Sequence, residues 1–193
     1  GIGAGWYELE YNAYGIPFPK ISARMEALDE ALQVMKGLWT QERTSFNGNH
    51  YTISDSPFEP KPLQRPHPPL WVGGAGEKYL LSIAGRRADG WNVWQLPVED
   101  YRRKASILAG FAEEAGRDPA TIRRSVGIQL AVAPTEAGVK AALAARDGDR
   151  ESPDVIAGTP EQVAERLRPY VEAGVQTILV EGQAPFDRDM MAL

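Results

Sequence analysis

One stretch of the chain, Trp71–Tyr79, constrains the fold more than any other. It begins with an apolar pair, contains three glycines within four positions (Gly73, Gly74 and Gly76), and is followed by apolar residues at helical spacing. The pattern predicts a strand, a glycine turn and a helix. Glycine lets a ligand approach the backbone because no Cβ stands in the way, and the first N–H groups of a helix attract anions. The stretch therefore indicates either a phosphate-binding turn or a plain strand–helix connection.

Strand-like and helix-like segments alternate along most of the chain, which predicts an α/β fold with a parallel sheet covered by helices. Five such units in an open sheet would leave two bare edges, which proteins normally avoid. We therefore expect a (β/α)8 TIM barrel of which the chain holds the C-terminal five units; the alternative is a doubly wound open sheet. The abrupt start at Gly1–Trp6 agrees with missing first units. The expected strands are 1–5, 70–73, 88–94, 125–133 and 177–180, and the expected helices include 21–39, 98–115, 135–146 and 159–173, the last with a capping box at Thr159 and Gln162.

Two segments depart from this alternation. Residues 6–20 are expected to form a loop. Further on, Asn47 and Gly48 stand between β-prone residues and favour a type I′ turn, so we expect a small hairpin over 44–53. The prolines between 57 and 69 disfavour helix and central strand and predict an extended segment. We therefore expect residues 1–193 to be a single domain with an insertion at about 43–69.

Composition excludes several classes of function. The 193 residues carry a formal net charge of −5 with no basic cluster, so we expect no nucleic-acid partner. No apolar run approaches the roughly 20 residues of a membrane span. The chain has no cysteine, which excludes disulfides and agrees with a cytoplasmic location. His50 and His67 have no acidic residue or histidine at metal-ligand spacing, so no metal site is expected.

Three predicted strand ends are candidates for a binding site, because ligands in βα barrels lie at the carboxyl ends of the strands. They are Gly3–Trp6, Gly73–Gly76 and Asn92–Gln95. Two glycine turns and an aromatic strand end suit a flat cofactor that carries a phosphate. Trp6 and Trp94 would line its pocket, although packing in the core is an equal alternative for Trp6.

The charged residues near these ends carry weaker signals. Lys78, Arg86 and Arg87 follow the glycine turn, and they form either a solvated face or electrostatic support for an acidic cofactor tail. Glu8 and Glu10 follow the first glycine turn; solvated loop carboxylates are commoner than substrate contacts. No Ser–His–Asp arrangement, Walker loop or paired-carboxylate signature stands out.

Taken together, these motifs resemble the bacterial luciferase-like monooxygenase superfamily. The resemblance spans nearly the whole chain, and it stays in order. Within the superfamily the chain looks most like the branch that uses coenzyme F420, a 5-deazaflavin, with the FMN-dependent monooxygenases as the near alternative. The resemblance is carried by Gly1–Trp6, Glu10–Tyr11, Gly15–Phe18, Arg24–Glu30, Leu38–Trp39, Phe46–Tyr51, Pro60–Gln64, Pro68–Gly74, Ala88–Asn92 and Gly158–Gln162.

The resemblance implies a TIM barrel with its cofactor at the carboxyl ends of the strands, a small-molecule substrate, and a homodimer with residues 21–40 as a candidate surface. Trp94 would lie on the substrate side. In the family, a strained peptide and the acid/base residue come from strands that precede Gly1–Trp6, so we name no catalytic residue. The implied cofactor-binding residues are Ala4, Gly5, Trp6, Gly73, Gly74, Gly76 and Glu77.

Three functions follow as hypotheses. The first is an F420-dependent oxidoreductase that moves a hydride between the deazaflavin and an organic substrate. The second is an FMN-dependent monooxygenase, and the third is a non-catalytic, truncated barrel. For the first, we expect Gly74→Val to weaken cofactor binding at least about tenfold and to leave the fold intact.

Overall fold

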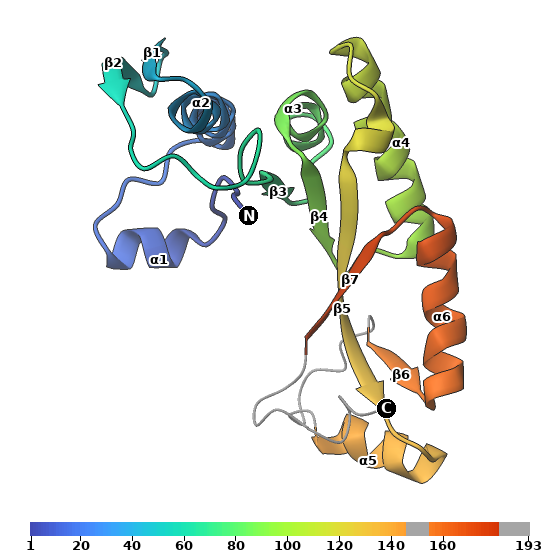
Figure 1. Ribbon diagram of the computed structural model, residues 1–193. Helices are drawn as coiled ribbons and strands as arrows, with labels where there is room; N and C mark the ends of the chain where they lie inside the picture. The colour runs from blue at the N-terminus through green and yellow to red at the C-terminus, as the bar shows by residue number, and fades with distance from the viewer. Residues whose placement is uncertain (146–154, 182–193) are drawn as a thin grey trace. The chain divides into compact units, whose positions relative to one another are not determined.

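The computed structural model of the chain describes residues 1–145 and 155–181 (Figure 1). Its packing divides the chain into two compact units. Unit 1 consists of residues 1–91 and 107–122, and unit 2 of residues 92–106 and 123–193. The division passes through the strand β4 (Gly90–Trp94) and the helix α4 (Val98–Glu114), which contribute residues to both units. Both elements form where the sequence predicts them.

The main helix of unit 1 is α2 (Ile21–Thr40), and its predicted extent is confirmed. Leu28 and Leu32, one turn apart, are buried on it, as expected from an apolar stripe. The predicted loop over 6–20 is wrong in part, because Glu8–Ala13 form the short helix α1. Glu8 and Glu10 lie in its first turn, where carboxylates interact favourably with the helix dipole.

The predicted hairpin is confirmed, but its turn differs from the prediction. The strands β1 (Arg43–Asn47) and β2 (Thr52–Pro57) pair antiparallel. Asn47 pairs with Thr52, so four residues connect the strands and not two. Gly48 is not among the glycines with a positive φ, which a type I′ turn would require.

The shape of this connection is determined by a residue of another element, the helix α2. The carboxylate of Glu30 on α2 is buried, and it accepts the main-chain N–H groups of residues 49, 50 and 51 at 2.7, 2.9 and 3.0 Å. A Cβ on Gly48 would overlap the same carboxylate. These three hydrogen bonds shape the connection in place of the local Asn-Gly preference.

The glycine stretch follows the proline-rich residues, which form neither helix nor strand over 58–69, as predicted. It contains the strand β3 (Trp71–Gly73), a turn, and the helix α3 (Leu80–Arg87). The strand expected at 1–5 is reduced to one bridge, in which Ile2 pairs parallel with Val72. Two chain segments therefore run side by side into their glycine turns.

Unit 2 is built on the long strand β5 (Arg123–Val132). β7 (Thr177–Glu181) pairs in parallel with residues 125–129 of β5, and β6 (Ile156–Gly158) pairs in parallel with residues 130–132. The predicted parallel pairing is confirmed here. β6 is absent from the predicted elements because three residues are too few for a recognisable alternation.

Two helices complete unit 2, α5 (Glu136–Ala145) and α6 (Pro160–Glu172), both where the sequence predicts them. The predicted capping box of α6 is confirmed. Thr159 accepts the main-chain N–H of Gln162, and the side chain of Gln162 accepts the main-chain N–H of Thr159 at 2.9 Å. The box pairs two N–H groups that the helix itself leaves without an acceptor.

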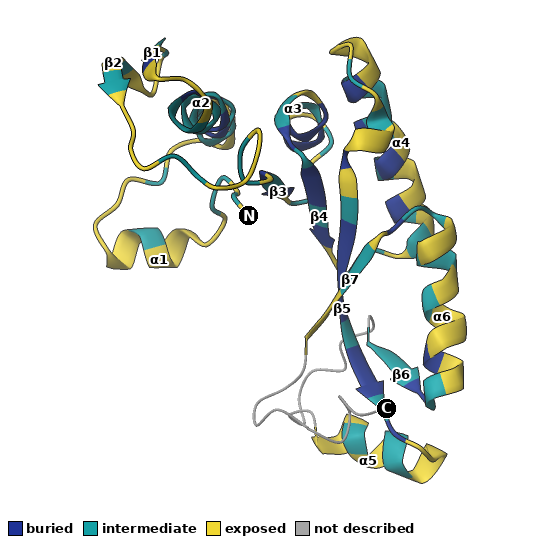
Figure 2. Cartoon of the chain, viewed as in Figure 1, coloured by how far each residue is buried: buried dark blue, intermediate teal, exposed yellow. Residues whose placement is uncertain are grey.

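Many of the buried residues lie on the strands β4 and β5, on α3 and on one side of α4 (Figure 2). In unit 1, Leu32, Val72 and Leu81 are fully buried, and in unit 2 Tyr101 and Val126 are. The strand β7 differs: among the described strands it pairs only with β5, and Leu179 and Val180 on it are 48% and 49% exposed.

Candidate functional site

The two glycine turns of unit 1 lie next to each other. The main-chain N–H of Ile2 donates to the carbonyl of Trp71 at 2.8 Å, and that of Gly73 donates to the carbonyl of Ile2 at 3.1 Å. Because the two segments run parallel, Gly3–Gly5 and Gly73–Gly76 leave them at the same edge. A Cβ on Gly3 would lie 3.6 Å from the carbonyl oxygen of Gly73. The structure thus brings together the first two predicted strand ends.

Two of the glycines have conformations that other residues rarely adopt. Gly5 has a φ of +73° and Gly74 a φ of +134°. Gly73 has no such φ, and a Cβ on it would meet nothing within 4 Å. The side of the turn at Gly73 is therefore open, and a ligand can approach the backbone there.

The turns point their carbonyl groups into the protein. The indole N–H of the fully buried Trp91 donates to the carbonyl of Gly74 at 2.8 Å, and the guanidinium of Arg24 donates to the carbonyl of Gly5. Within the described residues, no acceptor contacts the main-chain N–H groups of Ala4, Gly5, Gly74 or Gly76. Neighbouring N–H groups in a concave turn form an anion-binding site.

Trp91 and Arg24 are residues whose role the sequence prediction missed. Both residues belong to motifs that carry the family resemblance, but the motifs do not predict which carbonyl group each side chain contacts. The guanidinium of Arg24 also lies 3.9 Å from the centroid of the Phe18 ring and donates to the carbonyl of Pro19 at 3.0 Å. Arg24 therefore fixes the loop that follows the first turn.

The space behind Gly74 is filled, which corrects one expectation. A Cβ at this position would lie 2.7 Å from Cδ1 of Leu80, and the φ of +134° disfavours any side chain. This strain argues that Gly74→Val destabilises the fold, contrary to the expectation that the substitution leaves it intact. Gly76 and Glu77 precede α3 in a turn, and the main-chain N–H of Leu81 donates to the carbonyl of Gly76 at 3.0 Å.

The two tryptophans assigned to the pocket lie in different units. Trp6 is 83% exposed beside Tyr7, with ring centroids 5.2 Å apart, so core packing does not describe it. Trp94, in unit 2, is 46% exposed, and its indole N–H donates to the side-chain oxygen of Gln95 at 3.0 Å. Its ring covers Gly127, where a Cβ would overlap it. Each tryptophan thus presents an aromatic surface that a ligand can contact.

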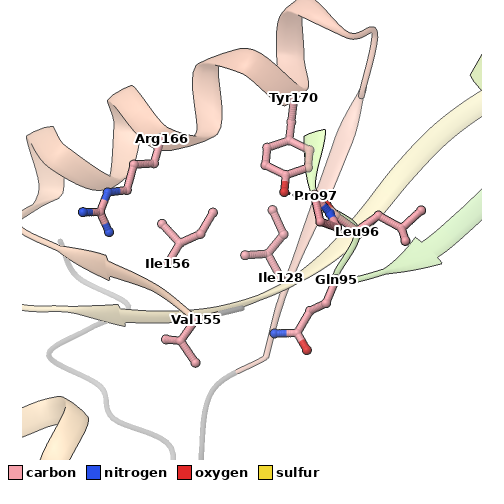
Figure 3. A pocket seen from close by; sticks show the side chains of 8 residues that line it. All are labelled: Gln95, Leu96, Pro97, Ile128, Val155, Ile156, Arg166 and Tyr170. Carbon is pink, nitrogen blue, oxygen red and sulfur yellow. Dashed lines mark hydrogen bonds between the residues drawn. The ribbon is translucent and has the colours of Figure 1, made fainter. Parts of the chain in front are cut away.

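Unit 2 has a hollow of about 290 Å³, which is lined in part by residues 95–97, directly after Trp94 in the sequence (Figure 3). Ile128 and Ile156 form apolar walls, and Tyr170 donates to the carbonyl of Leu96 at 2.7 Å. Gln95 has a φ of +40°, and its side-chain nitrogen is buried with no hydrogen-bond partner among the described residues. Strain and an unpaired donor at one residue are features of functional positions.

The carboxylates of Glu26 and Glu30 on α2 contact the connection of the hairpin and are held in the ionised form. Hydrogen bonds from Asn49 at 2.6 Å and His50 at 3.0 Å lower the pKa of Glu26. For Glu30, burial raises the pKa, but the three main-chain hydrogen bonds outweigh it, and its pKa lies below the ordinary value of 4.5.

Neither a metal-ion site nor a membrane-spanning helix is found among the described residues. They contain no group of three or more histidine, cysteine or acidic side chains placed to hold a metal ion. His50 contacts Glu26, and His67 lies against Trp39, with ring centroids 6.2 Å apart. None of the helices within 1–145 and 155–181 has the length and apolar character needed to cross a membrane.

Comparison with known proteins identifies the family. The sequence profile of the luciferase-like monooxygenases matches residues 1–151. The chain is 30% identical over 142 residues to the F420-dependent hydroxymycolic acid dehydrogenase of Mycobacterium tuberculosis, covering 74% of this chain and 38% of that protein. It is 29% identical over 154 residues to the FMNH2-dependent dimethylsulfone monooxygenase of Pseudomonas putida, covering 80% of this chain and 38% of that protein. The chain therefore belongs to the luciferase-like monooxygenase family, and it spans 38% of the length of each of these two relatives.

A solved structure supports the fold. The chain superposes on an F420-dependent secondary alcohol dehydrogenase, in complex with an F420-acetone adduct, with a TM-score of 0.75 at 21% identity. The match covers 92% of this chain and 62% of that one. The predicted α/β fold of the luciferase-like type, a parallel sheet with helices that is consistent with part of a TIM barrel, is confirmed.

Proposed function

We propose that the chain is part of an oxidoreductase that uses coenzyme F420 to move a hydride to or from a small organic substrate. The observation that carries this proposal is the pair of adjacent glycine turns, with N–H groups that face no acceptor in the described residues and an open side at Gly73. The F420-dependent relative and the F420-dependent structural neighbour support the choice of cofactor.

The predicted cofactor-binding residues of unit 1 would contact different parts of the cofactor. The N–H groups of Ala4, Gly5, Gly74 and Gly76 would bind the phosphate of the cofactor. The exposed indole of Trp6 would cover part of the ring system. When bound, the deazaflavin supplies the hydride-carrying carbon, and the protein supplies position and electrostatics.

Two of the site residues have less specific roles. Glu77 lies in the turn that leads to α3, next to the proposed phosphate. Trp94 would contact the substrate, for which its half-exposed ring is suited. Both assignments rest on the family resemblance and on position: Trp94 is the last residue of β4, and Glu77 lies in the turn after β3.

A second candidate is an FMN-dependent monooxygenase, and the dimethylsulfone monooxygenase of P. putida supports it. Both cofactors carry a phosphate, so the turns alone do not separate them. Titration of the protein with F420 and with FMN in parallel distinguishes the two cofactors. Tighter binding of F420, without oxygen consumption in the presence of reduced FMN, supports the first proposal; the reverse result supports the second.

The substitution Gly73→Val tests the binding site itself. The new side chain would project into open space, so we expect normal folding and a cofactor affinity at least about tenfold lower, because the backbone no longer reaches the phosphate. Fluorescence titration measures the affinity. Gly110→Val is the matched control, since a Cβ on Gly110 also meets nothing within 4 Å. An unchanged dissociation constant for Gly73→Val would contradict the site.

We further propose that the protein works in the cytoplasm and forms a homodimer in which residues between 21 and 40 make contacts. The lack of cysteines supports the first statement, and the family resemblance supports the second. Light scattering after size-exclusion chromatography measures the oligomeric state.

A further inference from the structure

One face of the sheet in unit 2 carries side chains from the three neighbouring strands β4, β5 and β7. In the register of β5 and β7, Gly127 pairs with Leu179 and Gln129 pairs with Glu181. On β4, the ring of Trp94 overlies Gly127, where a Cβ would overlap it. Because paired residues point to the same side of a sheet, as do residues two apart in one strand, these five residues share one face.

This face lies at the carboxyl ends of the strands, where α/β proteins bind their ligands. Trp94 is the last residue of β4, and Glu181 is the last residue of β7. Ile128, which lines the hollow of Figure 3, stands between Gly127 and Gln129 on β5 and therefore points to the opposite side of the sheet. The face and the wall that Ile128 gives to the hollow are thus on different sides of β5.

Half of this face is apolar and open. Trp94 and Leu179 are 46% and 48% exposed. Between them, Gly127 has no side chain, so the ring of Trp94 can lie down on β5. The hydrogen bond from the indole N–H to the side-chain oxygen of Gln95, at 3.0 Å, holds the ring there. The aromatic surface is therefore fixed in position and accessible to a ligand.

The other half of this face carries a negative charge. The side-chain nitrogen of Gln129 donates to the carboxylate of Glu181 at 2.8 Å. Glu181 is exposed and forms no ion pair with the described residues. A carboxylate accepts several hydrogen bonds, so Glu181 can accept more from a ligand. Its neighbours Trp94, Gln129 and Leu179 are uncharged, and a cation is the complementary partner of this arrangement.

We propose that this face binds the substrate and that the substrate is an organic amine in its protonated form. The ammonium group would donate to Glu181, and the apolar part would lie on Trp94 and Leu179. An exposed indole also attracts cations directly. Gly127, which lies under the indole, and Glu181 are one strand and two residues apart, so their Cα atoms are separated by about 8 Å, comparable to the length of a small amine.

The proposal names the class of substrate for the proposed function. That the face is the substrate's rests on the proposed function, whereas the binding of an amine to it does not.

The first experiment is an NMR titration of the unmodified protein with benzylamine and with benzyl alcohol. The two probes have nearly the same shape, but only benzylamine is charged at pH 7. We expect benzylamine to bind about three to five times more tightly, and the difference to shrink at high salt because exposed charges are screened. Both probes should shift the indole N–H signal of Trp94, which locates them on this face.

Two substitutions separate the parts of the site. Glu181→Gln removes the charge but keeps an oxygen that accepts the hydrogen bond of Gln129. We expect this variant to bind benzylamine about three to five times more weakly and to bind benzyl alcohol within about 1.5-fold of the unmodified protein. Trp94→Leu, which removes the aromatic surface, should weaken the binding of both probes by about threefold. Glu165→Gln, on the exposed surface of α6, is the control with the same change in net charge.

The outcomes separate this inference from the proposed function. Equal affinities of the two probes for the unmodified protein, or an unchanged affinity of Glu181→Gln for benzylamine, overturn the inference, as does an equal loss of both probes in Glu181→Gln. None of these results changes the titration with F420, so the proposed function is decided by that titration alone. If F420 does not bind but benzylamine behaves as expected, the proposed function fails, and the amine site stands without its role as the substrate site.

Discussion

Neighbouring glycines of one turn serve different purposes. Gly73 has room for a side chain, and its lack of one leaves the backbone accessible. Gly74 has a φ of +134° and Leu80 packed against it, so any side chain at this position is strained. Gly5 resembles Gly74, with a φ of +73° and Tyr11 behind it. A glycine in a binding turn is thus informative only when its conformation and surroundings are known.

This difference gives a prediction about stability. Gly74→Ala should lower the free energy of unfolding by about 1–3 kcal/mol, because the new residue adopts a disfavoured φ and Leu80 must shift. Gly73→Ala, the control at the adjacent position, should change it by less than about 0.5 kcal/mol. Urea denaturation measures both. Equal losses in the two variants would show that the turn differs from the one described.

At the scale of single residues, the sequence locates the glycines but not their partners. Trp91 and Arg24 contact carbonyl groups of residues far away in the chain, and no local pattern encodes such a contact. Gln95 is a further example: neither its φ of +40° nor its buried side-chain nitrogen, which has no partner among the described residues, follows from its sequence neighbours.

At the scale of elements, the hairpin β1–β2 depends on a helix. Glu30 of α2 binds three main-chain N–H groups of the connection, and its pKa is lowered by them although burial opposes this. The carboxylate therefore favours the folded state in its ionised form.

Glu30→Gln should loosen the hairpin, because an amide has one acceptor oxygen where the carboxylate has two. A depressed pKa means that the stabilisation is present above the unfolded value near 4.5 and is lost as the pH falls through the lower folded value. We expect Glu30→Gln to be less stable at pH 7 and to lose less stability between pH 5 and pH 3 than the unmodified protein. Thermal unfolding across this pH range measures the difference, with Glu113→Gln on the exposed side of α4 as control. Parallel pH profiles for all three proteins would contradict this role.

Sequence patterns predict the elements whose signals are local. The apolar stripe of α2 and the capping box of Thr159 and Gln162 are examples, and both are confirmed. The predictions that are wrong concern elements decided by distant contacts or by few residues. Glu30 overrides the Asn-Gly preference at Gly48, and β6 is only three residues long.

At the scale of the whole molecule, the proposed cofactor site links ligand binding to folding, because the two turns come together only in the folded state. A ligand present at about 100 times its dissociation constant stabilises the folded state by about 2.7 kcal/mol. We therefore expect F420 at this concentration to raise the unfolding free energy by about this amount, and Gly73→Val, with its affinity at least about tenfold lower, to reduce the increase to about 1.4 kcal/mol or less. Urea denaturation with and without F420 measures it. If F420 raises the unfolding free energy of Gly73→Val by the same amount, the cofactor does not bind at these turns.

The strand β7 has a consequence for handling the protein. Among the described strands it has one partner, β5, and it exposes half of Leu179 and Val180. An unpaired apolar strand edge is a template on which another chain can add a strand. When nothing else covers this edge, copies of the chain will tend to self-associate and aggregate as their concentration rises, whatever the cofactor does.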